Sequence, residues 1–215
     1  MRKVALITDG WRRLFTYAWP AGILQRIRET GEDVNLYIFN STGNWSRDAG
    51  YNRAEYNIYN LPELSDFDGI ILELNNISSP AVLADVISNA KRWGRPVVSI
   101  ANELGDFYYV GIDNYSAMKQ VIAHLHEVHD CKKFWLLVGA QDNYESSCRL
   151  QGMLDYAKEH KIKIDKDDIW YGSFDYKSGL EGYKHLWDRH KELPDAVICI
   201  NAVSYTHLRA HETVL

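Results

Sequence analysis

Polar residues and glycines recur where apolar, strand-like runs of this chain end. Three such signatures follow one another over residues 110–114, 134–139 and 149–152, and they read VGIDN, FWLLVG and RLQG. Polar groups at strand ends can hydrogen-bond a small molecule, and in open α/β sheets ligands bind outside the carboxyl ends of the strands. The signatures therefore predict a ligand-binding cleft.

Three motifs that are typical of catalytic or cofactor-binding sites are absent from the sequence. It contains no G-x-x-x-x-G-K-[ST] phosphate loop, no G-x-G-x-x-G dinucleotide fingerprint and no G-x-S-x-G nucleophile elbow. Asp and Glu are abundant, but on helix faces such residues usually serve solvation. We therefore expect no catalytic residue and no cofactor. The alternative is a sugar-processing or racemase-like enzyme, because doubly wound folds host many chemistries.

Two groups of histidines superficially resemble metal ligands. His207 and His211 are four residues apart and a glutamate follows, but the metalloprotease order is H-E-x-x-H and no third ligand is in register. His124, His126 and His129 lie at the C-terminal end of a predicted helix, where the helix dipole favours side chains that can carry a positive charge. We therefore interpret neither group as a metal site.

Strand-like apolar runs alternate with segments of helical periodicity along the whole chain. Pro20 suits the first turn of the first helix, and Gly31 suits its C-cap. The alternation predicts βαβ units and hence an α/β fold with parallel sheets. The predicted strands cover residues 3–8, 34–40, 68–73, 96–100, 109–112, 133–139, 168–174 and 196–200, and the predicted helices cover 19–30, 80–93, 115–128, 144–160 and 176–190.

Composition limits the classes of partner. The 215 residues carry a formal net charge of −5 and a sequence pI of about 5.9, with no basic run, so we expect no direct nucleic-acid contact by this stretch. No apolar run is long enough for a signal peptide or a membrane span. The three cysteines form no CxxC pattern and indicate a reducing compartment. We therefore expect a cytoplasmic protein.

From residue 3 to residue 201 the chain resembles the effector-binding core of LacI/GalR-type regulators, which share the type I periplasmic-binding-protein fold. An ordered set of motifs carries the resemblance: Asp9 and Phe15 after the first strand, DGIIL at 68–72, RPVV at 95–98, GIDN at 111–114, Arg149 three residues before Gly152, GSF at 172–174 and PDAV at 194–197. It implies two lobes of parallel sheets flanked by helices, residues 1–113 and 114–201. The second lobe is incomplete, and the ligand lies between the two.

The resemblance also implies which positions contact the ligand: Asp9, Phe15, Tyr17, Asn102, Glu103, Arg149, Phe174 and Asn201. The family places an arginine at the position of Arg149, and a guanidinium can make bidentate bonds to vicinal hydroxyls or a carboxylate. Phe174 offers an aromatic face for a sugar or a base. The alternatives are a surface arginine in the first turn of a helix, a core phenylalanine and, for Asp9, a carboxylate that caps the following turn.

Residues 202–215, AVSYTHLRAHETVL, depart from the family pattern, in which an aspartate follows the asparagine matched by Asn201. They resemble translated adaptor or vector sequence. We therefore expect a core truncated at its C-terminus and followed by a non-native tail; a genuine C-terminal peptide is the alternative. Repressors of the family carry a helix-turn-helix ahead of the first core strand. Since only two residues precede that strand here, we expect the output module, DNA-binding or diguanylate cyclase, beyond the C-terminal break; a truncated or miscalled gene start is the alternative.

Together these observations predict the ligand-sensing domain of a cytoplasmic transcriptional or signalling regulator. The expected ligand is a sugar or a similar small polar effector, and the expected mechanism is lobe closure, in which the ligand stabilises the closed arrangement. We expect the intact protein to be a homodimer that makes no membrane contact.

Overall fold

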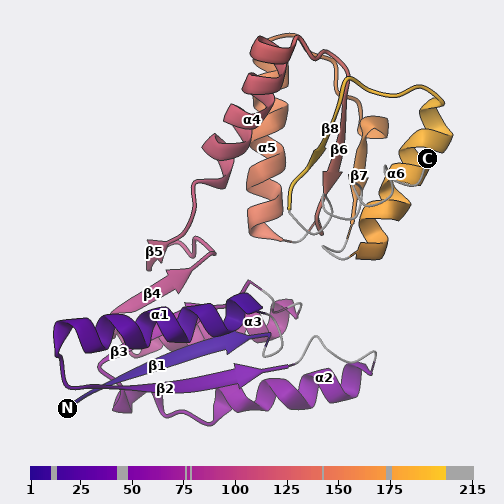
Figure 1. The fold of residues 1–215 in the computed structure, drawn as a ribbon. Coiled ribbons are helices and arrows are strands. Elements are labelled where there is room, and N and C mark those ends of the chain that lie inside the picture. Colours follow the sequence, from indigo (N-terminus) through magenta and orange to yellow (C-terminus); the bar gives the residue numbers. More distant parts are fainter. Residues whose placement is uncertain are drawn as a thin grey trace. The chain divides into compact units, whose positions relative to one another are not determined.

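The computed structural model describes residues 1–10, 14–42, 48–75, 77, 79–141, 143–172 and 176–201. The chain divides into two compact units, Met1–Ile112 and Asp113–Leu215. Each unit is built on its own parallel sheet (Figure 1). The described helices include none that is long and apolar enough to cross a membrane.

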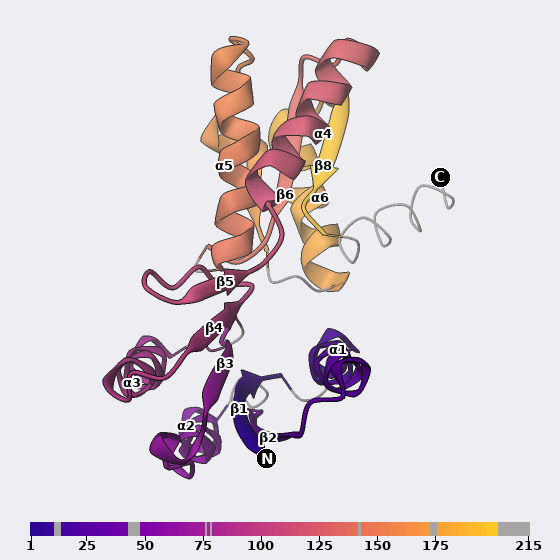
Figure 2. The same cartoon turned by 90° about the vertical axis from the view of Figure 1, so that its left-hand side faces the viewer.

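The first unit contains a five-stranded parallel sheet in the order β2-β1-β3-β4-β5. Helix α1 lies on one face of this sheet, and α2 and α3 lie on the other (Figure 2). Its elements in chain order are β1 (Arg2–Asp9), α1 (Leu14–Thr30), β2 (Val34–Ser41), α2 (Ala49–Glu55), η1 (Tyr56–Asn60), η2 (Leu64–Asp66), β3 (Gly69–Glu73), α3 (Pro80–Arg92), β4 (Val97–Ile100) and β5 (Tyr108–Val110).

Alternating residues of the central strands form the core of the first unit. Ala5 and Ile7 of β1 pack in one cluster with β3, and Val86 and Ala90 of α3 cover it. Leu6, between them, points to the opposite face and is equally buried. Since β1 and β3 are buried on both faces, their sequences are nearly continuous apolar runs, as is usual for parallel strands.

The second unit contains a three-stranded parallel sheet in the order β7-β6-β8. All five residues of β6 are buried. Phe134 and Leu136 face the core beneath α4 and α5, while Trp135 and Leu137 face α6. The elements are α4 (Asn114–His129), β6 (Phe134–Val138), α5 (Tyr144–Glu159), η3 (Lys166–Asp168), β7 (Ile169–Tyr171), α6 (Tyr176–His190) and β8 (Ala196–Cys199).

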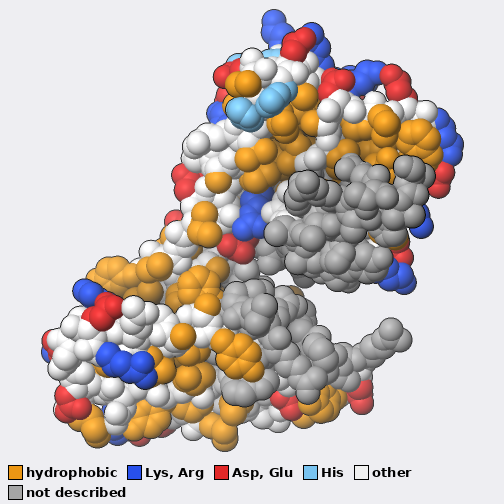
Figure 3. Space-filling view, in the orientation of Figure 1, with side chains coloured by type: hydrophobic (Ala, Val, Ile, Leu, Met, Phe, Trp, Pro, Cys, Tyr) orange, Lys and Arg blue, Asp and Glu red, His pale blue; other side chains and the backbone are white. Residues whose placement is uncertain are grey.

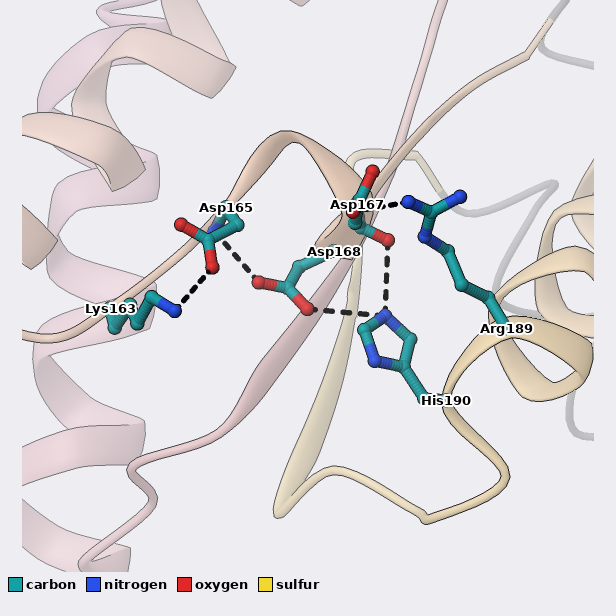
Figure 4. Close-up of polar contacts among 6 residues, drawn as sticks. All are labelled: Lys163, Asp165, Asp167, Asp168, Arg189 and His190. Atoms are coloured by element: carbon teal, nitrogen blue, oxygen red, sulfur yellow. Dashed lines mark hydrogen bonds and ion pairs between the residues drawn. The ribbon is translucent and has the colours of Figure 1, made fainter.

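Polar contacts fix the amino-terminal end of this second sheet. The Asp195 carboxylate accepts hydrogen bonds from the backbone N–H groups of Lys132 and Lys133, at 2.7 and 2.8 Å, which joins the start of β8 to the start of β6. At the end of α6, Arg189 pairs with Asp167. His190 Nε2 lies 3.3 Å from Asp168 Oδ1, so α6 is held to η3 (Figure 4).

The predicted α/β fold with parallel sheets flanked by helices is confirmed, and one local prediction is wrong. Pro20 does not open the first helix, because α1 begins at Leu14 and holds the proline inside. The helix therefore lacks one backbone hydrogen bond there and continues past a residue that usually ends or kinks it. Gly31 follows α1 with φ of +66°, a left-handed conformation that suits glycine at this position.

Candidate functional site

Buried polar side chains line the carboxyl end of the first sheet. Asp9 and Ser41, the last residues of β1 and β2, have no exposed surface, and Glu73, the last residue of β3, is 2% exposed. In the sheet register Thr8 of β1 lies beside Glu73. Carboxylates and hydroxyls are therefore concentrated at the sheet edge where α/β proteins bind their ligands.

Hydrogen bonds organise this buried edge. The hydroxyl of Thr8 donates to Glu73 Oε2 at 2.8 Å, and the hydroxyl of Tyr59 donates to the Thr8 carbonyl oxygen at 2.9 Å. Burial and the nearby charge of Asp9 raise the pKa of Tyr59 far above its ordinary value. Tyr59 therefore remains a neutral donor, which fits a site that already carries acidic groups.

Asn102 and Glu103 follow β4, separated from β1 by β3. Neighbouring strands lie about 4.8 Å apart, so the ends of β1 and β4 are separated by about 10 Å. The Ser99 hydroxyl donates to the Asn102 carbonyl oxygen at 2.6 Å and fixes the turn. Asn102 Oδ1 is buried and has no hydrogen-bond partner among the described residues, whereas Glu103 is exposed.

The remaining two predicted positions of the first unit lie on α1. Tyr17 is 51% exposed. Phe15 belongs to the first turn of α1, and its side chain lies outside the described residues. The structure thus places Asp9 and Asn102 on the same sheet edge, and Tyr17 on an exposed helix.

Arg149 lies at the carboxyl end of the second sheet, held by three different segments. Its Nε donates to Asn114 Oδ1 at 2.7 Å, and its Nη1 donates to the Ile200 carbonyl oxygen, just after β8, at 2.9 Å. Its Nη2 lies 3.8 Å from Glu145 Oε1, and Asn114 Nδ2 donates to the same oxygen at 3.3 Å. The Arg149 side chain is 20% exposed. A guanidinium has five N–H donors, so this network orients Arg149 and leaves donors for a further acceptor.

Gly152 explains the spacing of the RLQG signature. A Cβ at this position would overlap the carbonyl oxygen of Tyr115 and lie 3.1 Å from the Tyr115 carbonyl carbon. Glycine therefore allows α5 to approach the backbone of α4 closely. Arg149 is three residues earlier, on the same helix face, and so reaches Asn114 at the start of α4. Gly152 and Arg149 therefore both belong to the contact between α5 and α4.

The start of helix α5 is tied to the end of β6. The side chain of Asn143 accepts a hydrogen bond from the Ser146 backbone N–H at 2.9 Å and caps the helix. The Gly139 backbone N–H donates to the Ser146 hydroxyl at 3.1 Å, which ties the strand end to the first turn. Asn201 is partly buried and directly follows the carbonyl that Arg149 binds. Phe174 and residues 202–215 lie outside the described residues.

Sequence reasoning missed three residues of these two edges: Glu73, Asn114 and Glu145. Glu73 is the last residue of the predicted strand that contains Ile70 and Leu72, just as Asp9 ends the first strand, so the same criterion would have found it. Asn114 belonged to a noted signature but was not assigned a contact. Glu145 is four residues before Arg149 and had the spacing of a helical ion pair.

A separate cavity of about 400 Å³ lies at the opposite, amino-terminal end of the second sheet. Its lining includes Lys133 and Lys163, and each of these pairs with an acidic side chain. These are exposed ion pairs of the kind that contribute little free energy. Of the described residues that line this cavity, none is a buried polar residue.

Comparison with known proteins first defines the class of fold. The structure is similar to a periplasmic solute-binding protein of an ABC transporter from Actinobacillus succinogenes, solved with bound D-allose, with a TM-score of 0.74 and 15% identity over 100% of this chain and 74% of that one. It is also similar to a sugar-binding transcriptional regulator of the LacI family from Escherichia coli, solved with phosphate, with a TM-score of 0.73 and 18% identity over 99% and 73% of the two chains. The fold is that of these ligand-binding proteins.

The sequence comparison agrees with the fold comparison. Catabolite control protein A from Staphylococcus epidermidis is 28% identical over 149 residues. The match covers 68% of this chain, which spans 43% of the length of that relative. No family model matches. The expected resemblance to the effector-binding core of LacI-type regulators is therefore confirmed by solved structures and by one curated relative.

Proposed function

We propose that this chain is the ligand-sensing domain of a transcriptional or signalling regulator and that its effector is a sugar or a similar small polar molecule. The observation that carries the proposal is Arg149, which two hydrogen bonds and one acidic neighbour orient at a strand end. A fixed guanidinium binds vicinal hydroxyls or a carboxylate in a defined direction. The D-allose bound by one similar protein supports a sugar.

The effector in this proposal contacts polar groups of both units. The first unit supplies Asp9 and Asn102 at its sheet edge, and the second supplies Arg149 and Asn201. Such a ligand has a higher affinity for the closed arrangement than for the open one, and this difference shifts the population toward closure. The shift is then passed to an output module in a homodimeric, cytoplasmic regulator.

A sugar screen with product analysis tests this function. The purified chain is incubated with a panel of mono- and disaccharides, and thermal unfolding is followed for each. A sensor is stabilised in proportion to ln(1 + [L]/Kd) and returns the sugar unchanged. Conversion of the sugar would instead support an enzyme. For a bound sugar, X-ray scattering in solution then measures closure: the radius of gyration falls on binding, and an unchanged radius contradicts the proposed mechanism.

A further inference from the structure

Two exposed histidines meet at the C-terminal end of α4. The Nε2 atoms of His124 and His129 lie 3.2 Å apart, and their rings are nearly perpendicular, with a 79° interplanar angle. The chain turns just after His129, because Asp130 adopts a left-handed conformation with φ of 54°. His129 is the last residue of α4, and its ring meets that of His124, five residues earlier, edge to face. Figure 3 shows histidine side chains gathered on the surface of this unit.

The distance between the two nitrogens fits a shared metal ion. Bonds from zinc to an imidazole nitrogen are about 2.0–2.1 Å long. Two such bonds that end on nitrogens 3.2 Å apart enclose an angle of about 100° at the metal. That angle is close to tetrahedral. Both rings can present the Nε2 lone pair if each carries its proton on Nδ1.

The neighbouring histidine has a different environment. His126 Nδ1 lies 3.1 Å from the Tyr156 hydroxyl, which itself donates to Glu127 at 2.9 Å. In the part of the chain that the structure describes, the rings of His124 and His129 make no polar contact except with each other. The pair is therefore accessible from solvent and not committed to the packing of α4 on α5.

We propose that His124 and His129 chelate a divalent transition-metal ion such as Zn²⁺, with water in the remaining positions. No third His, Cys, Asp or Glu joins the pair within the described ranges, so the site is open and exchangeable. When both imidazole rings are neutral, the metal replaces the hydrogen bond between His124 and His129, and binding releases no net proton.

Histidine side-chain ¹⁵N NMR during a Zn²⁺ titration tests the proposal. His207 and His211 are four residues apart, so they are first replaced by alanine, which removes a second closely spaced histidine pair. We expect the Nε2 resonances of His124 and His129 to shift together and to saturate at one Zn²⁺ per chain. Unchanged resonances would show that the pair shares only a proton, and would overturn the proposal.

Matched variants then assign the ligands. In the same background, His124→Gln and His129→Gln are each expected to weaken Zn²⁺ binding about tenfold or more. His185→Gln, which changes an exposed histidine on α6, leaves the affinity unchanged. Circular dichroism checks that each variant keeps its fold. Equal affinity in the His124, His129 and control variants would overturn the assignment.

Discussion

Arg149 Nε donates a 2.7 Å hydrogen bond to Oδ1 of Asn114, a residue that is 5% exposed. The bond joins the second turn of α5 to the first residue of α4. Arg149 also holds the carbonyl of Ile200, so one side chain connects two helices and a strand end. The same residue is therefore a candidate ligand contact and part of the packing of its unit.

Replacing Arg149 should affect ligand binding and stability together. Arg149→Ala leaves the buried Oδ1 of Asn114 without its donor, which costs about 1–3 kcal/mol of unfolding free energy. Urea unfolding measures the loss, and the variant should still unfold cooperatively. Arg149→Lys keeps the charge but lacks the fork that bonds Asn114 and Ile200. An unchanged unfolding free energy in Arg149→Ala would contradict the described network.

The coupling between the two residues can be measured separately. In a double-mutant cycle of Arg149→Ala and Asn114→Ala, the second substitution should cost less when the first is present. Residues that share a hydrogen bond usually couple by about 0.5–3 kcal/mol. Additive effects in urea unfolding would show that the two side chains act independently.

Gly152 should tolerate no side chain. Gly152→Ala places a methyl group against the Tyr115 backbone and should destabilise the protein by about 1–3 kcal/mol, because backbone atoms must shift. Gly22, inside α1, is the matched control, since a Cβ there meets nothing within 4 Å. Gly22→Ala should stabilise the helix by about 0.5–1 kcal/mol. Thermal unfolding distinguishes the two, and equal effects would contradict the close helix approach.

Asp195 should contribute a pH-dependent part of the stability. Hydrogen bonds from the backbone N–H groups of Lys132 and Lys133 lower the pKa of this carboxyl below its usual range. A lowered folded-state pKa gives stability that is complete above the unfolded-state pKa, about 3.9, and that is lost as the pH falls through the folded-state value. The difference in unfolding free energy between the parent and Asp195→Asn should therefore disappear in acid. A difference that is constant with pH would exclude this role.

Cys199 should react slowly with alkylating agents. Burial raises the pKa of its thiol from 9.0 to about 11. At pH 8 the thiolate fraction then falls roughly a hundredfold, and the thiolate is the reactive form. Mass spectrometry of peptides after timed iodoacetamide treatment measures the rate in the folded protein, with the urea-unfolded chain as the reference. Equal rates in the two states would show that Cys199 is not protected.

The alternation of strands and helices could be predicted from the sequence, because buried parallel strands are short apolar runs and the helices carry an apolar face. Helix α6 has the predicted bounds, and α5 ends one residue before the predicted end. The start of α1 could not be predicted, since Pro20 has the sequence signal of a first turn but lies inside the helix.

Less of the candidate site than of the fold could be predicted from the sequence. Arg149 could be selected from its motif, and the structure shows what orients it. The partnership of Asn114, Glu145 and the Ile200 carbonyl depends on how α4, α5 and β8 pack, which no local pattern specifies. Likewise, the hydrogen bond between Thr8 and Glu73 joins residues 65 positions apart through the sheet register.

Calorimetric titration of the parent chain and of Arg149→Ala with the sugar selected by the unfolding screen tests the central claim most directly. The experiment also recovers the sugar and identifies it. The proposed sensor predicts saturable binding of one sugar per chain, recovery of the sugar unchanged, and loss of measurable binding in Arg149→Ala while its circular dichroism spectrum is retained. Equal affinity in the folded variant, or conversion of the sugar by the parent, would contradict the account.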